Sequence, residues 1–314
     1  MTVPVVVIAG PTASGKSSLA LALAERFDGV VVNADSMQLY HELDILTDRP
    51  DREALGRAPH VLYGVVAAAA GCSVGKWREM AHAEIERAGR ERRVACVTGG
   101  TGLYLRALTA GLAVIPDIPP AIRRAARAHL AAVGPVEFHA ELAQRDSVMA
   151  ARLRVSDRQR LMRAWEVLEA TGQSLAAWQD APDQVPPADW KIFSFRLLPP
   201  RETVYAACND RFDRMIDRGA VEEARAFAAL DLDPSLPAMK AVGVPPMLRF
   251  VAGDMTLEDA RQSAQRDTRR YARRQMTWFR NQMTPTETLS EQYSERLNSK
   301  IFPIISDFLL TTDQ

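Results

Sequence analysis

Long apolar runs and cysteines are scarce in this chain of 314 residues. No apolar run approaches the roughly 18–20 residues that a membrane-spanning helix needs, so we expect no membrane span. The apolar segment 1–9 has no preceding basic residue and no small-residue cleavage site, so it does not resemble a secretory signal. The three cysteines (Cys72, Cys96 and Cys208) are far apart, which argues against a disulfide framework or a cysteine-rich zinc site and favours a reducing cytoplasm.

Net charge is absent as well, because 39 basic residues balance 39 acidic ones. The balance is uneven along the chain: residues 121–165 contain nine arginines against four acids, and residues 261–280 contain seven against one. Such tracts in a neutral chain predict a local site for a polyanion. Only five of the basic residues are lysine, and a genome that encodes arginine by default is the alternative explanation for that bias. The length suggests two domains, or one large domain with an insertion.

Strand and helix patterns alternate in the first hundred residues. The β-branched run Val3–Ala9 predicts a strand buried on both faces, followed by a small-residue loop at 10–15 and a helix at 17–27. Two more short buried strands are expected at 30–32 and 94–98. This alternation predicts an α/β fold with a parallel sheet.

The loop after the first strand matches the phosphate-binding pattern G-x-x-x-x-G-K-[ST] in the required strand–loop–helix context. Backbone amides and the helix N-terminus attract a phosphate, Lys16 adds a positive charge, and the Ser17 hydroxyl can coordinate Mg²⁺. The pattern does not distinguish ATP, GTP or another diphosphate as the ligand. The candidate diphosphate-binding residues are Gly10, Pro11, Thr12, Ala13, Ser14, Gly15, Lys16 and Ser17.

Polar residues follow the second and third strands. Asp35 ends the second strand, and Thr101 follows Gly99-Gly100 after the third, so both are expected at the carboxyl edge where open α/β sheets bind ligands. A carboxylate there can act as a general base or hold Mg²⁺ through water. The alternatives are that Asp35 only caps the next helix and that Thr101 is a helix N-cap.

A proline-rich segment at 115–120 interrupts the pattern, and the following residues to about 178 favour helices. A strand is expected again at 191–198, with mostly helices after it. We therefore expect an α/β, P-loop NTPase-like parallel-sheet core with an all-helical insertion. The expected boundaries are 1–115 and 185–285 for the catalytic core, 116–184 for the insertion, and 286–314 for a C-terminal tail or helix.

Several motifs, in this order, resemble those of the tRNA dimethylallyltransferases, also called tRNA isopentenyltransferases. The motifs are GPTASGKS at 10–17, DSMQLY at 35–40, GGTGLY at 99–104, DRQRLMR at 157–163, RFDRM at 211–215 and YARRQMTWFR at 271–280. The resemblance covers about residues 3–282. It implies transfer of a dimethylallyl group from dimethylallyl diphosphate to N6 of the adenosine just 3′ of the anticodon, in tRNAs reading codons that begin with U. It also implies a cytoplasmic monomer whose phosphate loop holds the prenyl diphosphate.

The resemblance implies roles for individual residues. Asp35 would accept the proton of the adenine amine, Thr101 would contact that adenine, and Arg211 would lie near the diphosphate, with an ordinary surface salt bridge as the alternative for Arg211. Mg²⁺ bound by Ser17 is the implied cofactor, and tRNA and dimethylallyl diphosphate are the implied partners. The implied tRNA contacts are Asp35, Ser36, Met37, Gln38, Thr101, Arg123, Gln159, Arg160, Leu161, Met162 and Arg163.

The tract 261–280 predicts a helix whose arginines, with Tyr271 and Trp278, suit RNA; the alternative is a solvated face with Trp278 and Phe279 in the core. The chain departs from many relatives at Arg49, where they carry lysine, and at Val244, where they carry tyrosine. Two other functions remain open. A P-loop small-molecule kinase would consume ATP, and a non-catalytic RNA-binding protein would not need Asp35.

Overall fold

The computed structural model describes residues 2–111, 113, 115–180 and 186–312. The chain folds as two compact units, Met1–Thr109 with Pro186–Gln314, and Ala110–Val185. The expected boundary between insertion and core at 184–185 lies outside the described residues. No helix in the described part of the chain has the length and apolar character required to cross a membrane.

The first unit is built on a six-stranded sheet in which all neighbouring strands are parallel, in the order β3-β2-β4-β1-β5-β6. This confirms the expected α/β class, and the four strands predicted from the sequence form the centre of the sheet. The two edge strands were missed because runs of two and three residues leave no periodic signal. The strands are β1 Val3–Ala9, β2 Gly29–Asn33, β3 His60–Val61, β4 Val94–Gly99, β5 Trp190–Leu197 and β6 Glu287–Leu289.

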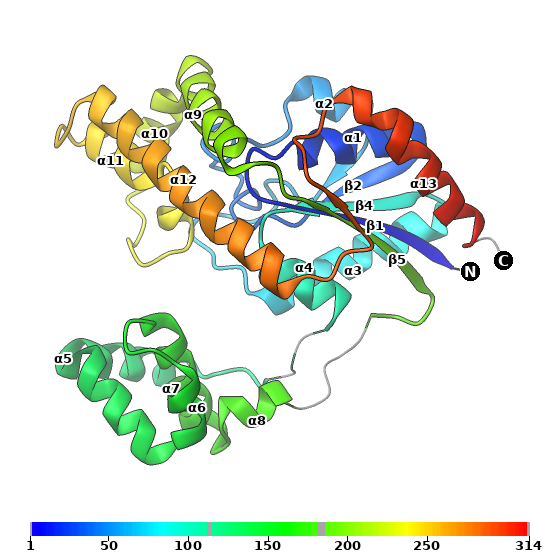
Figure 1. Ribbon diagram of the computed structural model, residues 1–314. Helices are drawn as coiled ribbons and strands as arrows, with labels where there is room; N and C mark the ends of the chain where they lie inside the picture. Colours follow the sequence, from blue (N-terminus) through cyan, green and yellow to red (C-terminus); the bar gives the residue numbers. More distant parts are fainter. Residues whose placement is uncertain (1, 112, 114, 181–185, 313–314) are drawn as a thin grey trace. The chain divides into compact units, whose positions relative to one another are not determined.

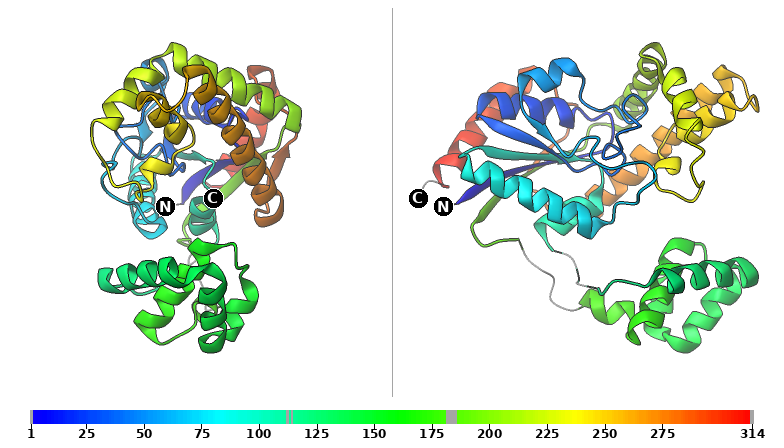
Figure 2. Two further views of the ribbon diagram at one scale, coloured as in Figure 1. Left: turned by 90° about the vertical axis from the view of Figure 1, so that its left-hand side faces the viewer. Right: turned by 180° about the vertical axis from the view of Figure 1, so that it is seen from behind.

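Helices cover both faces of this sheet (Figures 1 and 2). Val5 and Val7 of β1 share one core with α3 and α4, whereas Val6 and Ile8 share another with α1 and α13. Successive side chains of a strand point to opposite faces, so a strand covered on both sides is a continuous apolar run. The helices are α1 Lys16–Arg26, α3 Val74–Arg90, α4 Gly102–Thr109 and α13 Asn298–Leu310.

A group of helices lies at the end of the sheet opposite the N-terminus (Figure 1). The longest, α12, begins after a Thr256 side-chain cap and packs against α9 and α11. Its buried positions Ala260, Ala264, Thr268 and Ala272 recur every four residues, which permits close packing with the neighbouring helices. The remaining helices of this unit are α2 Arg52–Arg57, α9 Arg201–Asp217, α10 Ala220–Ala228, α11 Val244–Val251 and α12 Leu257–Gln282.

All the secondary structure in the described part of the second unit is helical, and the unit has its own apolar core, which includes Phe138, Leu142 and Leu161. Gly134, with φ of 77°, interrupts the first helix, and Gly172, with φ of 69°, ends the third. Both glycines adopt left-handed backbone that other residues avoid. The helices are α5 Pro120–Arg145, α6 Ser147–Arg152, α7 Arg158–Thr171 and α8 Leu175–Asp180.

Candidate active site

The phosphate loop connects β1 to α1 in a conformation that depends on Gly15. Its φ is 86°, and a Cβ at this position would lie 2.9 Å from Cβ of Tyr293. Lys16 follows as the first residue of α1 and is only 9% exposed. The Ser14 hydroxyl is buried and has no hydrogen-bond partner among the described residues. The loop therefore presents a buried cation and an unused hydroxyl, as an anion site requires.

Burial lowers the pKa of Lys16 from 10.5 to about 8, because a buried ammonium loses its hydration. Asp35 opposes this shift and Arg211 adds to it, so both side chains lie within electrostatic reach of Lys16. The ammonium donates to the carbonyl oxygen of Pro11 at 3.3 Å. Lys16 forms no ion pair within the described residues. An anionic ligand would supply the missing counter-charge.

Arg211, on α9, forms the salt bridge that was the alternative to a diphosphate contact, and the diphosphate contact stays a prediction. Its Nη1 lies 3.6 Å from Asp48 Oδ2, and Arg218 lies 3.4 Å from the other oxygen of that carboxylate. The Nε of Arg211 is buried with no hydrogen-bond partner in the described structure. The guanidinium is therefore held by an ion pair near Lys16 and still has a donor available for a further anion.

Asp35 and Thr101 meet because the ends of β2 and β4 touch. A Cβ at Gly99 would lie 2.1 Å from the Ala34 carbonyl, so only glycine permits this approach. The Thr101 hydroxyl accepts a hydrogen bond from Ser36 N at 2.9 Å, and Thr101 N donates to Ala34 O at 3.3 Å. The Thr101 side chain thus binds the Asp35 segment. The sheet edge holds both residues in one place, as expected for a ligand site.

The alternative that Asp35 caps a following helix is wrong. The next helix begins only at Arg52, and Asp35 Oδ1 accepts from Met37 N at 3.0 Å to close a local turn. Its backbone is fixed by Asn33, whose side chain accepts from Asp35 N at 2.8 Å and donates to Asp35 O at 3.0 Å. Trp77 Nε1 in turn donates to Asn33 O at 2.9 Å. No sequence pattern predicted these roles of Asn33 and Trp77, although an asparagine at a strand end is a recognisable turn residue.

Three residues near this edge have structural roles. Gln38 Nε2 donates to the carbonyl oxygens of Thr47 and Asp48, at 2.9 and 2.7 Å. Arg49 lies 3.6 Å from Asp44 and packs under the loop at residue 64. Val244 is 1% exposed, so its side chain packs in the core and is not placed to stack on a ligand.

The implied tRNA contacts of the second unit differ in exposure. Arg123, Gln159 and Arg160 are exposed, whereas Leu161 is fully buried in the helical core. The Leu161 side chain packs inward, so a tRNA contact at this position would come from its backbone, and the implied contact stays a prediction. Burial lowers the pKa of Arg163, and Arg123 contributes to the same shift, so the two cations are close to each other. Glu166 Oε2 lies 3.8 Å from Arg163 Nη1 and opposes the shift, so one carboxylate already faces this pair of cations.

The basic tract of α12 has two distinct sides. Arg273, Arg274 and Arg280 are exposed. Trp278 is partly buried against the core and packs on Gly102, while Phe279 is fully buried. Burial, with Asp35 nearby, raises the pKa of Tyr271. The core alternative therefore holds for Trp278 and Phe279, and the arginines provide the accessible positive surface.

The described residues contain no cluster of three or more His, Cys, Asp or Glu side chains that could enclose a metal ion. Ser17, exposed in the first turn of α1, supplies one hydroxyl beside the phosphate loop. Mg²⁺ commonly uses one or two protein oxygens and completes its coordination with substrate phosphates and water. A single hydroxyl at Ser17 fits a Mg²⁺ site completed by substrate phosphates and water. It does not fit a metal site built from protein ligands alone.

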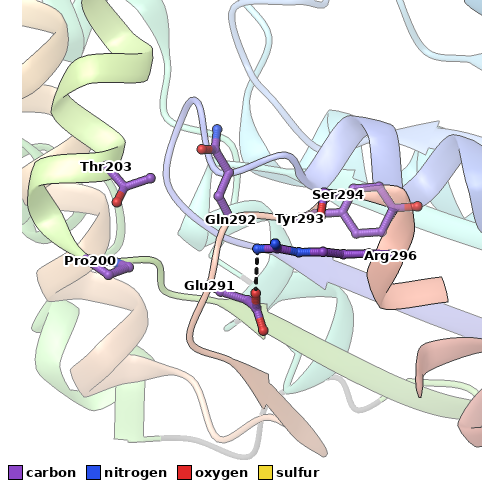
Figure 3. A pocket seen from close by; sticks show the side chains of 7 residues that line it. All are labelled: Pro200, Thr203, Glu291, Gln292, Tyr293, Ser294 and Arg296. Atoms are coloured by element: carbon purple, nitrogen blue, oxygen red, sulfur yellow. Dashed lines mark hydrogen bonds and ion pairs between the residues drawn. The ribbon is translucent and has the colours of Figure 1, made fainter. Parts of the chain in front are cut away.

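The segment 291–296, near the C-terminus, binds the phosphate loop through hydrogen bonds. Gln292 Nε2 donates to Ala13 O at 3.1 Å, and Tyr293 N donates to Ser14 O at 3.3 Å. This segment lines a pocket of about 600 Å³. Figure 3 shows Pro200 and Thr203 across the pocket from Gln292 and Tyr293. Nothing in the sequence pattern predicted this contact, because irregular polar segments carry no periodic signal.

Comparisons with known sequences agree on one family. The family model described as IPP transferase matches residues 38–282, and one described as isopentenyl transferase matches residues 3–62. A tRNA dimethylallyltransferase of Parvibaculum lavamentivorans is 50% identical over 98% of this chain and 97% of the relative. Another, from Rhodospirillum centenum, is 52% identical over 90% of each chain.

Solved structures give the same result. A tRNA isopentenylpyrophosphate transferase of Bacillus halodurans matches with a TM-score of 0.71 and 28% identity, covering 99% of this chain and 98% of the other. A eukaryotic dimethylallyltransferase acting on tRNA matches with a TM-score of 0.83 over 98% of this chain and 80% of the other. Its identity is 23%, so this second match supports the fold alone.

Proposed function

This chain belongs to the tRNA dimethylallyltransferase, or IPP transferase, family, and we propose how its residues carry out prenyl transfer. The chain is a transferase that attaches a dimethylallyl group to tRNA, and the small-molecule kinase alternative is set aside. The finer assignment is our proposal: the donor is dimethylallyl diphosphate, and the acceptor is N6 of the adenosine just 3′ of the anticodon in tRNAs reading codons that begin with U. We place the protein in the cytoplasm as a monomer.

The phosphate loop binds the diphosphate of the donor. Its residues are Gly10, Pro11, Thr12, Ala13, Ser14, Gly15, Lys16 and Ser17. The C1–O bond breaks in the transfer, and the diphosphate leaves with the bonding electrons. Lys16, Arg211 and the loop amides stabilise the charge that develops on it. Ser17 would hold Mg²⁺, which when bound neutralises part of that charge.

Asp35 and Thr101 act on the adenine. The N6 amine is a weak nucleophile because its lone pair is delocalised into the ring, so removal of its proton assists the attack on C1. The Asp35 carboxylate accepts that proton as the N6–C1 bond forms. Thr101 lies beside Asp35 through Ser36 and is placed to bind the same base. The observation that carries this proposal is the joint position of Lys16, Arg211 and Asp35 at one end of the sheet.

The helical unit and the arginines of α12 bind the tRNA. Base contacts come from the segment 35–38 in the first unit, and backbone contacts come from Arg123, Gln159, Arg160, Met162 and Arg163 in the second. The target adenine must leave the anticodon-loop stack to reach a buried diphosphate, at a cost of about a few kcal/mol. Phosphate contacts by arginine offset that cost.

The proposal is tested with unmodified tRNA that has an adenine-rich anticodon loop, incubated with the protein, Mg²⁺ and dimethylallyl diphosphate in the absence of ATP. Mass spectrometry of a nuclease digest is expected to show dimethylallyl-adenosine in the fragment that contains the anticodon. Product at another position would contradict the acceptor assignment. If no product forms and ATP is consumed in the presence of small hydroxyl acceptors, the small-molecule kinase would again be the favoured function.

A further inference from the structure

One buried glutamine joins the two loops that serve the two substrates. Gln275 lies on α12 and is 5% exposed. Its Oε1 accepts from Thr12 N at 2.8 Å, and its Nε2 donates to Gly100 O at 2.8 Å. Thr12 belongs to the phosphate loop, and Gly100 directly precedes Thr101. A single side-chain amide therefore connects the donor loop to the acceptor loop.

The helix is oriented to present this side chain. Tyr271, Gln275 and Trp278 are spaced by four and three residues, so they lie on one face of α12. Trp278 packs on Gly102, where a Cβ would lie 2.3 Å from the indole. Tyr271 lies within electrostatic reach of Asp35 and next to the Gln275 side chain. This face of α12 thus lies along the phosphate loop and the Gly100 loop. Of its three residues, Gln275 is the one that hydrogen-bonds to both loops.

The chemistry of the contact requires a primary amide. Gln offers an acceptor and a donor in one plane at a fixed separation, whereas Glu lacks the donor and Asn is one methylene shorter. Both partners are backbone groups that water does not reach, so loss of either bond leaves an unpaired buried group. The loops would then shift to find other partners.

We propose that Gln275 is a positioning residue for the transfer reaction, one that fixes the separation between the phosphate loop and the Thr101 segment. The proposal rests on the transfer function above. Gln275 acts through Thr12 and Gly100. Without its side-chain amide, both substrates would still bind, but C1 of the donor and N6 of the adenine would be poorly aligned. Misplacement by about 1 Å costs on the order of a hundredfold in rate.

The first test compares Gln275→Met with Gln265→Met, in a single-turnover assay with tRNA and dimethylallyl diphosphate. Gln265 lies on the same helix, donates to Asp213 Oδ1 at 2.8 Å, and contacts neither loop. We expect Gln275→Met to lower the transfer rate roughly tenfold to a hundredfold while the Kd of each substrate changes less than about threefold. Gln265→Met should retain the wild-type rate. Equal rates for both variants, or a loss confined to substrate affinity, would overturn the proposal.

A double-mutant cycle separates positioning from loss of folded protein. If Gln275 acts through the Thr101 segment, Gln275→Met should reduce the rate much less in a Thr101→Ala background than in the wild type. A reduced folded fraction would instead lower the rate by the same factor in both backgrounds. Equal factors would contradict the proposal.

Gly100→Ala approaches the same contact from the other side and leaves α12 unchanged, so it also serves if Gln275→Met does not fold. The added Cβ would lie 2.2 Å from Gln275 Nε2, so the side-chain amide must move, whereas the 3.5 Å to Asp35 Oδ2 is an ordinary van der Waals contact that leaves the carboxylate in place. We expect the same loss of rate with near-normal substrate affinity. An unaltered rate would contradict the proposal. A wild-type protein without transfer activity would refute the proposed function itself, so the two failures are distinguishable.

Discussion

Asp35 uses its carboxylate for two purposes. Oδ1 accepts from Met37 N and so fixes the side chain, and no hydrogen bond within the described residues involves Oδ2. Oδ2 also lies 3.5 Å from the position of a Cβ at Gly100, next to the acceptor loop. One oxygen thus orients the group while the other is available to accept a proton.

Asp35→Asn separates these two purposes, because the amide oxygen retains the bond to Met37 N while basicity is lost. We expect the single-turnover transfer rate to fall roughly a hundredfold or more, with tRNA Kd unchanged within about twofold. Asp51→Asn is the control, since Asp51 also accepts from a backbone amide, that of Ala54, but outside the site. A near-normal rate for Asp35→Asn would exclude the general-base role.

Lys16 gives the free enzyme a pH dependence. Its pKa of about 8 lies below the ordinary 10.5, so the side chain is charged below pH 8 and loses its charge as the pH rises through that value. We expect kcat/KM for dimethylallyl diphosphate to decline above pH 8, because a neutral amine attracts the diphosphate less. The pH profile of kcat/KM measures this. A constant kcat/KM up to pH 10.5 would contradict it.

At the scale of elements, the sequence predicted the central strands and the phosphate loop. It did not predict the side chains that hold the phosphate loop in place. Val3–Ala9 is apolar throughout because both faces are covered, and the glycine spacing of the loop is imposed by phosphate binding. By contrast, Gln275 and the segment 291–296 reach the loop from distant parts of the chain. Such long-range polar contacts follow from tertiary packing, and no local period records them.

Gly15→Ala tests the loop as an element. The change places an L-residue at φ of 86° and a Cβ 2.9 Å from Tyr293, so the loop must move or strain by about 1–2 kcal/mol. We expect the Kd for dimethylallyl diphosphate to rise roughly tenfold or more while tRNA affinity is retained. Gly172→Ala is the matched control, with φ of 69° and nothing within 4 Å of the added Cβ. Equal diphosphate affinity in both variants would show that the loop geometry is not required.

At the scale of the whole molecule, the chain forms two compact units that each have their own core, and our proposal divides the function between them. The first contains the phosphate loop, Asp35 and Thr101, and the described part of the second carries exposed arginines such as Arg123 and Arg160. The basic tracts predicted a polyanion as partner, and tRNA is a polyanion. The burial of Leu161, however, could not be inferred from the seven-residue motif that contains it. Which motif residues face solvent is decided by the helix packing.

Arg163→Met tests the role of the second unit. We expect tRNA affinity to fall, and the slope of log affinity against log salt to decrease by about one, because one phosphate contact is lost. Binding of dimethylallyl diphosphate should not change. Arg152→Met is the control in the same unit: Arg152 makes two hydrogen bonds to Asp180, at 3.1 and 2.8 Å, whereas Arg163 has only a 3.8 Å ion pair with Glu166. A salt slope identical to that of the wild type would contradict a phosphate contact at Arg163.

We propose that one site couples departure of the diphosphate to attack by the tRNA amine. A single-turnover reaction tests this coupling when diphosphate release and dimethylallyl-adenosine are quantified together, with and without tRNA and in the absence of ATP. We expect equal amounts of both products over the whole time course, and neither product without tRNA. Diphosphate release that continues without tRNA, or modified tRNA formed without equivalent diphosphate, would contradict it.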